Sequence, residues 1–415
     1  MKRLAPIFTI LSLLFILSMF YRVASGVIAP DLIRDLELNA EMLGNVGGAF
    51  FYAFAFAQIP MGPLLDRMGP RIVITSFAFI GALGSLLFGL AHSYPAAIVA
   101  RALMGAGMAS MLMGSLKVFT LNFPARTFST LAGTFISVGT IGSATAASPL
   151  AYCASLIGWR MTFIATAAVT ALLGMVAFRV LAATSVSHRA TRAEIPDGLT
   201  VARSAALILG SLSYWQIAVT AFFRYGTFVA LQGLWFGLYL MDVRGLSPVE
   251  AGNILVMLAV GNAAGGPVAG RMADRGSTSI KGVTLGGLIL YCLSILPLTG
   301  LFSIHSIFWY GVIGFSLGFF HSFGALLYSH AKGLFPITIA GTAMAWVNLF
   351  IMAGGAVLTS GLGKVIERYP RTGSVYPPEA YYICFWICFL SMAASLVFYA
   401  FSRARQQDAP LQVTT

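Results

Sequence analysis

Long apolar segments alternate with short polar ones along all 415 residues of the chain. Each apolar segment has about 20 residues, the length of a helix that crosses the roughly 30 Å hydrocarbon core of a bilayer. Ten-residue segments of alternating polarity are absent, so the pattern favours a helix bundle over a membrane β-barrel. It predicts twelve spans, at residues 7–30, 43–63, 72–92, 95–121, 127–152, 159–182, 212–240, 249–270, 280–300, 305–331, 336–361 and 378–402.

The chain also repeats itself once. Gly62-Pro-Leu-Leu-Asp66-Arg67-Met-Gly69-Pro-Arg71 recurs in weaker form as Gly270-Arg-Met-Ala-Asp274-Arg275-Gly276, with the two aspartates 208 positions apart. Gly44-Asn45 recurs as Gly252-Asn253 at the same offset of 208. We therefore predict an all-α membrane protein of two six-helix pseudo-repeats in one orientation. Residues 1–182 and 212–402 form the halves, 183–211 a polar cytoplasmic linker, and 403–415 a cytoplasmic tail.

Composition and charge support a membrane location. Hydrophobic residues make up 58% of the chain and charged residues 9%, against about 25% charged residues in an average soluble protein. The first apolar segment follows Lys2 and Arg3 and is interpreted as a span, since no convincing cleavage site follows it.

The net charge of +12 reports topology rather than nucleic-acid binding. With both termini in the cytoplasm, 15 of the 25 lysines and arginines fall on the cytoplasmic side and only 6 on the other side. This excess follows the positive-inside rule. We expect a multi-pass protein of the cell inner (cytoplasmic) membrane with both termini in the cytoplasm.

Four basic residues lie inside predicted spans: Arg22, Arg101, Lys117 and Arg224. Arg22 and Arg224 are mid-span, and each is beside a tyrosine, Tyr21 or Tyr225. All 13 acidic residues fall at helix ends, in loops or in the tail. A buried arginine without a carboxylate at its depth is costly, and its planar fork suits carboxylate or phosphate. The pattern predicts that the substrate is an anion and supplies the counter-ion.

His321 is the only histidine well inside a predicted span. Its side chain could bind substrate, carry a proton, or simply pack. Other polar or aromatic residues in the spans are candidates for a cavity lining, although helix packing is the better explanation for each of them alone: Tyr52, Gln58, Gln232, Trp235, Tyr328, Trp346 and Asn348. No metal-ligand cluster or cofactor motif is found, and no carboxylate pair lies within the spans, so an enzyme is not expected.

The repeated loop resembles the signature of the major facilitator superfamily, and Arg101-Ala-Leu-Met-Gly105-Ala-Gly107 looks like that family's Arg-x-x-x-Gly-x-Gly motif in the fourth helix. The resemblance covers essentially the whole chain and implies a twelve-helix transporter. Members of that family mostly work as monomers, so the resemblance also implies a monomer. It also implies that a charged cluster latches the two halves on the cytoplasmic side. In this sequence the cluster is Asp66, Arg67, Arg71, Asp274 and Arg275.

The segment from Phe20 to Leu32 is similar to the first helix of organophosphate:phosphate antiporters and of organic anion transporters. The former place one arginine in each of the first and seventh helices around the phosphate, which corresponds here to Arg22 and Arg224. The organic anion transporters of this group that are symporters often have Asp immediately before the arginine of the first helix, where this chain has Tyr21. Gly139-Thr-Ile-Gly142 followed by Ser148-Pro149 is only a degenerate match to the family's antiporter motif.

The sequence therefore predicts a secondary transporter that moves a small phosphorylated or carboxylated anion by alternating access. A substrate site would contain Arg22, Arg224, Tyr21, Tyr225 and His321. Two alternatives remain: proton-coupled uptake of an amino acid or another zwitterion, with His321 carrying the proton, and a transporter-like ligand sensor. An exchanged anion or a co-transported proton is the expected partner of the substrate, and no nucleotide-binding loop is present.

Overall fold

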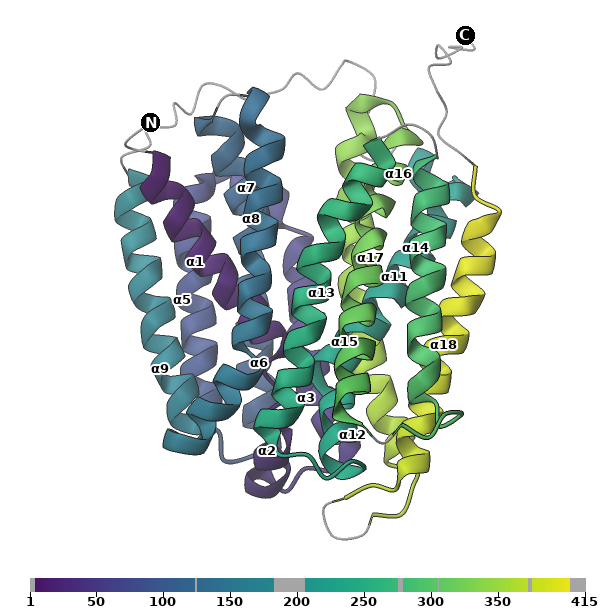
Figure 1. The fold of residues 1–415 in the computed structure, drawn as a ribbon. Helices are drawn as coiled ribbons and strands as arrows, with labels where there is room; N and C mark the ends of the chain where they lie inside the picture. Colours follow the sequence, from purple (N-terminus) through teal and green to yellow (C-terminus); the bar gives the residue numbers. More distant parts are fainter. Residues whose placement is uncertain are drawn as a thin grey trace.

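The computed structural model describes residues 4–123, 125–182, 206–274, 279–304, 306–371 and 375–403, and the regular structure in these ranges is helical. The first half contains α1 (Leu4–Val23), α2 (Ala29–Leu36), α3 (Ala40–Gln58), α4 (Met61–Arg67), α5 (Gly69–Gly89), α6 (Tyr94–Met108), α7 (Ser110–Asn122), α8 (Ala125–Thr145) and α9 (Ser148–Ala182). The second half contains α11 (Leu212–Ala230), η1 (Leu231–Trp235), α12 (Phe236–Asp242), α13 (Pro248–Asp274), α14 (Ile280–Ile295), η2 (Leu296–Leu298), α15 (Ile307–His321), η3 (Ser322–Ala325), α16 (Leu326–Gly333), α17 (Ile337–Ile366) and α18 (Pro378–Ala400). The halves stand side by side (Figure 1).

The prediction of an all-α membrane protein is confirmed. Ten of the described helical segments are long and apolar enough to cross a membrane. The helices α3 and α8 lie at the two remaining predicted spans, 43–63 and 127–152. The predicted linker falls mainly on residues 183–205 and the tail mainly on 404–415, which lie outside the described residues, so these boundaries stay predictions.

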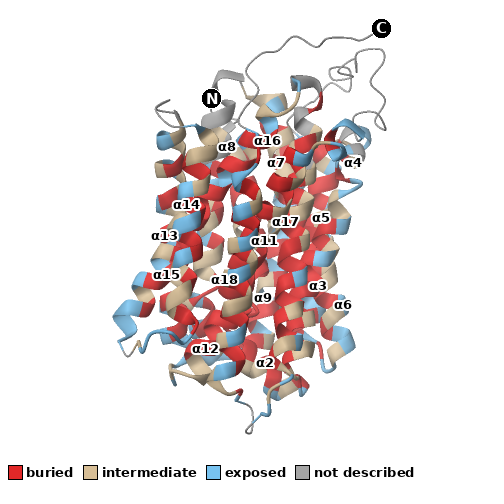
Figure 2. Ribbon diagram, turned by 90° about the vertical axis from the view of Figure 1, so that its right-hand side faces the viewer, coloured by how far each residue is buried: buried red, intermediate tan, exposed pale blue. Residues whose placement is uncertain are grey.

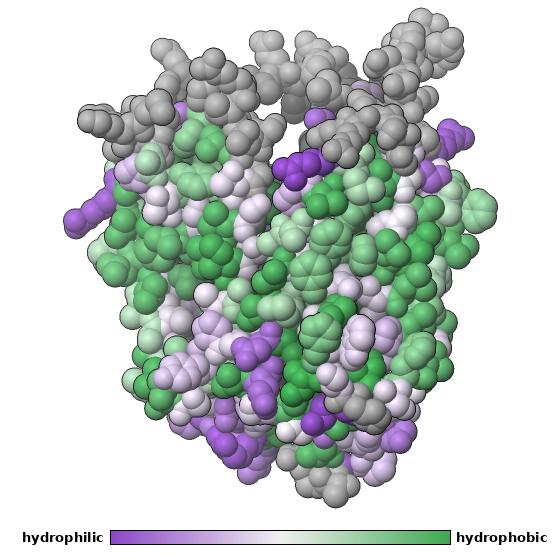
Figure 3. Space-filling view, in the orientation of Figure 1, coloured by the Kyte–Doolittle hydropathy of each residue, from purple (hydrophilic) through white to green (hydrophobic). Residues whose placement is uncertain are grey.

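The surface of the bundle is that of a protein surrounded by lipid. Figure 2 shows buried residues along the inner faces of the helices and exposed residues on the outer faces. Many of the exposed side chains are large and apolar, such as Leu172 on α9 and Leu390 on α18, which are 60% and 57% exposed. Hydrophilic residues gather at the two ends of the molecule (Figure 3). An apolar belt between polar ends is the surface that a bilayer requires.

The first predicted span is not continuous. The sequence predicts one helix over residues 7–30, but α1 ends at Val23 and α2 begins at Ala29, so this prediction is wrong. A Cβ on Gly26 would lie 2.8 Å from the carbonyl oxygen of Gly233 in the other half. Only glycine allows this approach, and Pro30 then restarts the helix at its first turn.

The second half has a matching irregularity in the same place. There α11 passes through the five-residue π-helix η1 before α12, and π segments often mark functional sites. Arg22 lies in the last turn of α1 and Arg224 lies in α11 shortly before η1. Each buried arginine is therefore followed by a discontinuity in its helix.

The described contacts between the halves lie from the middle of the bundle to the end that holds α2 and α12. We call this the distal end, and the end where α1 begins and α18 finishes the terminal end. The broadest contact between the halves joins α3 to α17. A Cβ on Gly44 would lie 2.9 Å from the carbonyl oxygen of Thr359, and one on Gly363 would lie 2.5 Å from that of Ala40. Small residues thus let the two helices approach closely.

Glu367 joins the two halves at the distal end through a hydrogen bond to the start of α3. Its Oε2 accepts hydrogen bonds from the backbone N–H of Ala40 at 2.8 Å and from the hydroxyl of Tyr376 at 2.7 Å. Arg371 adds a bond from its Nη1 to the carbonyl oxygen of Leu38 at 3.2 Å. A carboxylate at the start of α3 is favoured by the helix dipole as well as by the hydrogen bond.

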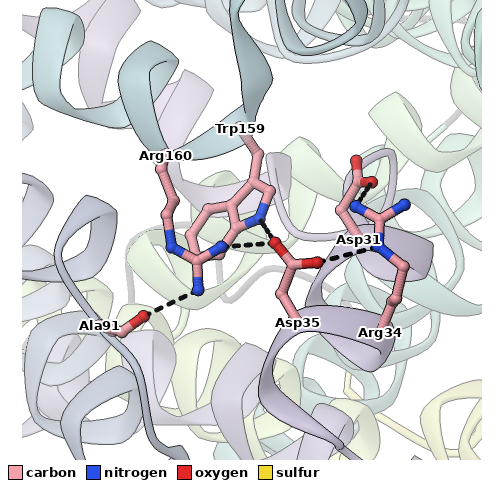
Figure 4. Close-up of polar contacts among 6 residues, drawn as sticks. All are labelled: Asp31, Arg34, Asp35, Ala91, Trp159 and Arg160. Atoms are coloured by element: carbon pink, nitrogen blue, oxygen red, sulfur yellow. Dashed lines mark hydrogen bonds and ion pairs between the residues drawn. The ribbon is translucent and has the colours of Figure 1, made fainter.

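A second carboxylate, Asp35, holds the short helix α2 to its own half (Figure 4). Its Oδ2 accepts from Trp159 Nε1 at 3.0 Å and from Arg160, while Oδ1 accepts from Arg34 Nε at 2.9 Å. Arg160 also donates to the carbonyl oxygen of Ala91 at 3.1 Å. Trp159 and Arg160 follow Gly158, whose φ of 78° produces the turn within α9. The cluster thereby fixes α2 against α9 and the loop after α5.

We expect Asp35→Asn to lower the free energy of unfolding by about 1–3 kcal/mol, since it weakens charge-assisted hydrogen bonds in a partly buried cluster. Arg34→Gln should cost less than about 1 kcal/mol, because the Arg34 side chain is 71% exposed. Thermal unfolding in detergent measures both variants. Equal losses of stability in the two variants would contradict a special role for Asp35.

Asp35 also predicts how the stability of the protein depends on pH. Burial alone would raise the pKa of Asp35, but hydrogen bonds from Trp159, Arg34 and Arg160 outweigh it and lower the pKa below its ordinary value. A carboxylate whose pKa is lowered in the folded state contributes its full stabilisation at pH values above its ordinary pKa. This stabilisation is lost as the pH falls through the lowered pKa. The stability difference between the wild type and Asp35→Asn should therefore be constant near neutral pH and shrink below about pH 4.

We expect Glu367→Ala to open the distal end. The variant removes the carboxylate that bonds the N–H of Ala40 at the start of α3, so a cysteine introduced as Ser360→Cys, at a residue that is 6% exposed, should react with a maleimide several-fold faster than in the parent. Cys153, the one exposed cysteine in the described residues, is first replaced by serine. Lys364→Ala is the matched control, because its pair with Glu41 joins two exposed side chains at 3.6 Å. Identical labelling rates in both backgrounds would show that Glu367 does not hold this end closed.

Candidate functional site

Arg22 reaches from the first half into the second near the middle of the bundle. The residue is 7% exposed. Its Nη1 donates to the hydroxyl of Tyr225 on α11 at 3.0 Å, and its Cζ lies 4.5 Å from the centre of the Phe54 ring. Its Nε is buried and has no hydrogen-bond partner among the described residues. Arg22 is therefore held by neutral groups and keeps donors to spare.

Arg224 has the corresponding position in the second half and is 5% exposed. Its Nη1 lies 2.9 Å from Nε2 of His321 and 3.1 Å from the carbonyl oxygen of the same residue. A Cβ on Gly324 would lie 1.9 Å from Cδ of Arg224, so the glycine makes room for the arginine. Its Nε is also buried and unpartnered among the described residues.

The groups around His321 are aromatic and polar. Phe228 stacks on the imidazole with ring centres 3.7 Å apart, and Nδ1 lies 3.2 Å from Oδ1 of Asn262 on α13. The Tyr328 hydroxyl donates to Oδ1 of Asn348 at 2.9 Å. Side chains from α11 and α13 thus surround His321, which lies in α15.

No carboxylate of the described residues pairs with Arg22 or Arg224. The ion pairs described lie near the distal end, between Arg34 and Asp31 or Asp35, Arg160 and Asp35, and Lys364 and Glu41. Likewise, the described part of the chain contains no group of three or more His, Cys, Asp or Glu residues that could hold a metal ion. Arg22 and Arg224 therefore carry two positive charges with neutral partners.

The structure brings together four of the five predicted substrate residues. Arg22 meets Tyr225, Arg224 meets His321, and the rings of Tyr225 and His321 lie 6.2 Å apart. Tyr21 lies elsewhere: its hydroxyl is 2.8 Å from that of Thr170 on α9, inside the first half. Adjacent residues of a helix point about 100° apart, which explains why Tyr21 and Arg22 face different neighbours.

The helix-4 motif is packed in the first half. Arg101 is 1% exposed and donates from Nη1 to the carbonyl oxygen of Tyr21 at 2.8 Å, in the last turn of α1. A Cβ on Gly105 would lie 2.0 Å from the carbonyl oxygen of Phe50, and one on Gly107 would lie 2.2 Å from the backbone nitrogen of Gly81. Arg101 thus stabilises the end of the helix that carries Arg22, and the glycines allow close packing.

The predicted latch is described only in part. Arg71 donates from Nε to the carbonyl oxygen of Phe178 at 3.0 Å and lies over that ring, within the first half. Arg67 is exposed at the end of α4. The side chains of Asp66 and Asp274 and the whole of Arg275 lie outside the described residues. The latch therefore stays a prediction.

Several residues at the site were not predicted from the sequence. Asn262 and Tyr291 surround His321, and Phe54 and Met352 contact Arg22. An asparagine in the middle of the apolar α13 is a signal that could have been used. Phe54 and Met352 offer no such signal, because apolar residues are common in every span.

Comparison with known proteins identifies the family. A model described as the Major Facilitator Superfamily matches residues 10–359. The probable galactarate/D-glucarate transporter GudP of Escherichia coli (strain K12) is 23% identical over 410 residues, which cover 88% of each chain. The probable sulfoacetate transporter SauU of Cupriavidus necator is 26% identical over 389 residues, covering 88% of this chain and 87% of the relative.

A solved structure supports the same fold. A bacterial homologue of the human lysosomal transporter Spinster, in an inward-facing and occupied conformation, superimposes with a TM-score of 0.77 at 17% identity. The match covers 99% of this chain and 100% of the other. At this identity the similarity concerns the fold.

Proposed function

Because this chain belongs to the Major Facilitator Superfamily, we propose that it is a secondary transporter of a small organic anion. The observation that carries the proposal is the pair of buried arginines, Arg22 and Arg224, which have neutral partners and no carboxylate among the described residues. The names of two relatives agree with it, since galactarate, D-glucarate and sulfoacetate are all anions. The substrate class is a small molecule with a carboxylate, sulfonate or phosphate group.

The arginines explain how binding and movement are coupled. One guanidinium belongs to each half, and each has unpartnered donors. An anion between them accepts hydrogen bonds from both and screens the repulsion of two like charges in a medium of low dielectric. The bound anion therefore favours a conformation in which the halves close around it, as population shift requires.

The direction of opening follows from the charge distribution. The excess of lysines and arginines favours a cytoplasmic location for the terminal end, and Glu367 joins the two halves at the distal end. The described conformation then corresponds to an inward-facing carrier in the cell inner membrane, working as a monomer. Asp66, Arg67, Arg71, Asp274 and Arg275 form the latch of the opposite, outward-facing state.

We expect Arg22→Gln and Arg224→Gln each to lower the affinity for the anion at least roughly thirtyfold, the equivalent of about 2 kcal/mol for the loss of one buried charge contact. The assay is uptake of labelled D-glucarate, sulfoacetate and D-gluconate by proteoliposomes, with neutral glucitol as a solute control. Arg368→Gln is the matched protein control, since Arg368 is exposed at the distal end.

The outcomes separate the alternatives. Saturable uptake of an anion that both central variants lose and Arg368→Gln keeps supports the proposal. Uptake that survives both variants, or occurs only with glucitol, contradicts it. Saturable binding without any flux or exchange would identify a ligand sensor in place of a transporter.

A further inference from the structure

The contact between Arg224 and His321 determines the protonation state of the histidine. The two groups meet through Nη1 and Nε2 at 2.9 Å. A guanidinium has donors and no acceptor, so Nε2 must offer its lone pair and carry no proton. The single proton of the ring is then on Nδ1, which lies 3.2 Å from Oδ1 of Asn262 and donates to it. In this conformation His321 is neutral and its tautomer is fixed.

The surroundings oppose a second positive charge. The groups that face His321 are Arg224, Tyr225 and Phe228 from α11, Asn262 from α13 and Tyr291 from α14. His321 is 5% exposed. Among these neighbours only Arg224 carries a charge at neutral pH, and it is positive. A protonated His321 would lose its hydrogen bond with Arg224 and face a like charge at contact distance.

An anion at Arg224 reverses both effects. Its oxygen atoms compete for the Arg224 donors and release the Nε2 lone pair, and its negative charge favours an imidazolium beside it. A proton from water can then bind Nε2, and the new N–H donates to the anion. No other bond is made or broken.

We propose that His321 is the proton-binding site of the transport cycle, and that it is coupled to the substrate through Arg224. This inference rests on the proposed anion transport. Linkage is reciprocal, so the anion raises the affinity for the proton by the same factor as the proton raises the affinity for the anion. The carrier is thus a proton-anion symporter, although it lacks an acidic residue beside Arg22.

The first experiment needs no substrate. Histidine ring resonances of the purified, isotope-labelled protein are followed by NMR from pH 8 to pH 5, and His321 is assigned by the signal that His321→Gln removes. In the wild type we expect His321 to stay neutral throughout this range. In Arg224→Gln the like charge is gone, so the midpoint of the His321 titration should move up into this range. An identical titration of His321 in both proteins overturns the inference.

The second experiment measures coupling in proteoliposomes at a clamped membrane potential. With one proton per substrate, an inward acid gradient of one pH unit should raise the accumulation ratio of labelled D-gluconate or D-glucarate about tenfold. In His321→Gln, the uptake of the anion that remains should no longer respond to the gradient. The matched control is His330→Gln: His330 is buried at the terminal end between Tyr399 and the carbonyl oxygen of Arg403, and this variant should respond as the wild type does.

The outcomes distinguish the two proposals. Anion uptake that ignores the gradient in the wild type, or a response that His321→Gln retains, overturns the role of His321 and leaves anion transport intact. If no anion of the panel is taken up, the proposed substrate class fails. The NMR titration then decides the role of His321. If Arg224→Gln leaves the midpoint of the His321 titration unchanged, the inference is overturned. If Arg224→Gln raises this midpoint, the result supports His321 as a proton site governed by Arg224.

Discussion

The centre of this protein is organised by the cost of a guanidinium in a medium of low dielectric. Three arginines of the described core are almost fully buried, Arg22, Arg101 and Arg224. Arg101 donates to two backbone carbonyl oxygens, those of Tyr21 and Val46, and so stabilises the first half. Arg22 contacts a phenol, an aromatic ring and a thioether, and Arg224 contacts the imidazole and the carbonyl oxygen of His321. Arg101 is held within the first half, whereas Arg22 and Arg224 belong to opposite halves and form the proposed site for an anion, which would compensate their charges.

The same residues explain why the helices are irregular where they are. Arg22 precedes the break between α1 and α2, and Arg224 precedes η1. Gly26 in the break packs against Gly233 in η1, so the two discontinuities meet on the distal side of the arginines. The proposed anion site is therefore bordered on its distal side by a close backbone contact between the two halves.

The sequence was sufficient for the fold because membrane helices are specified by long apolar segments, and each half repeats the pattern of the other. It also indicated Arg22 and Arg224, since a charge in the middle of a span is rare enough to be informative. It could not indicate that α1 stops at Val23, because the break depends on a glycine contact with the other half. Nor could it exclude Tyr21 from the site, since the direction of a side chain depends on the rotation of its helix. The pairing of His321 with Arg224 could not be predicted either, because it depends on how α11 packs against α15.

The charge at the centre also restricts the stoichiometry of transport. With His321 neutral, the empty site carries two positive charges. A monoanion and one proton add no net charge, so the loaded and empty carriers have equal charge and the cycle is electroneutral. A dianion with one proton moves one net negative charge into the cell, which an inside-negative potential opposes by about 2.3 kcal/mol per 100 mV. A site with one histidine and no carboxylate among the described residues therefore favours a substrate with a single negative charge, and a dianion would depend on the pH gradient to overcome the potential.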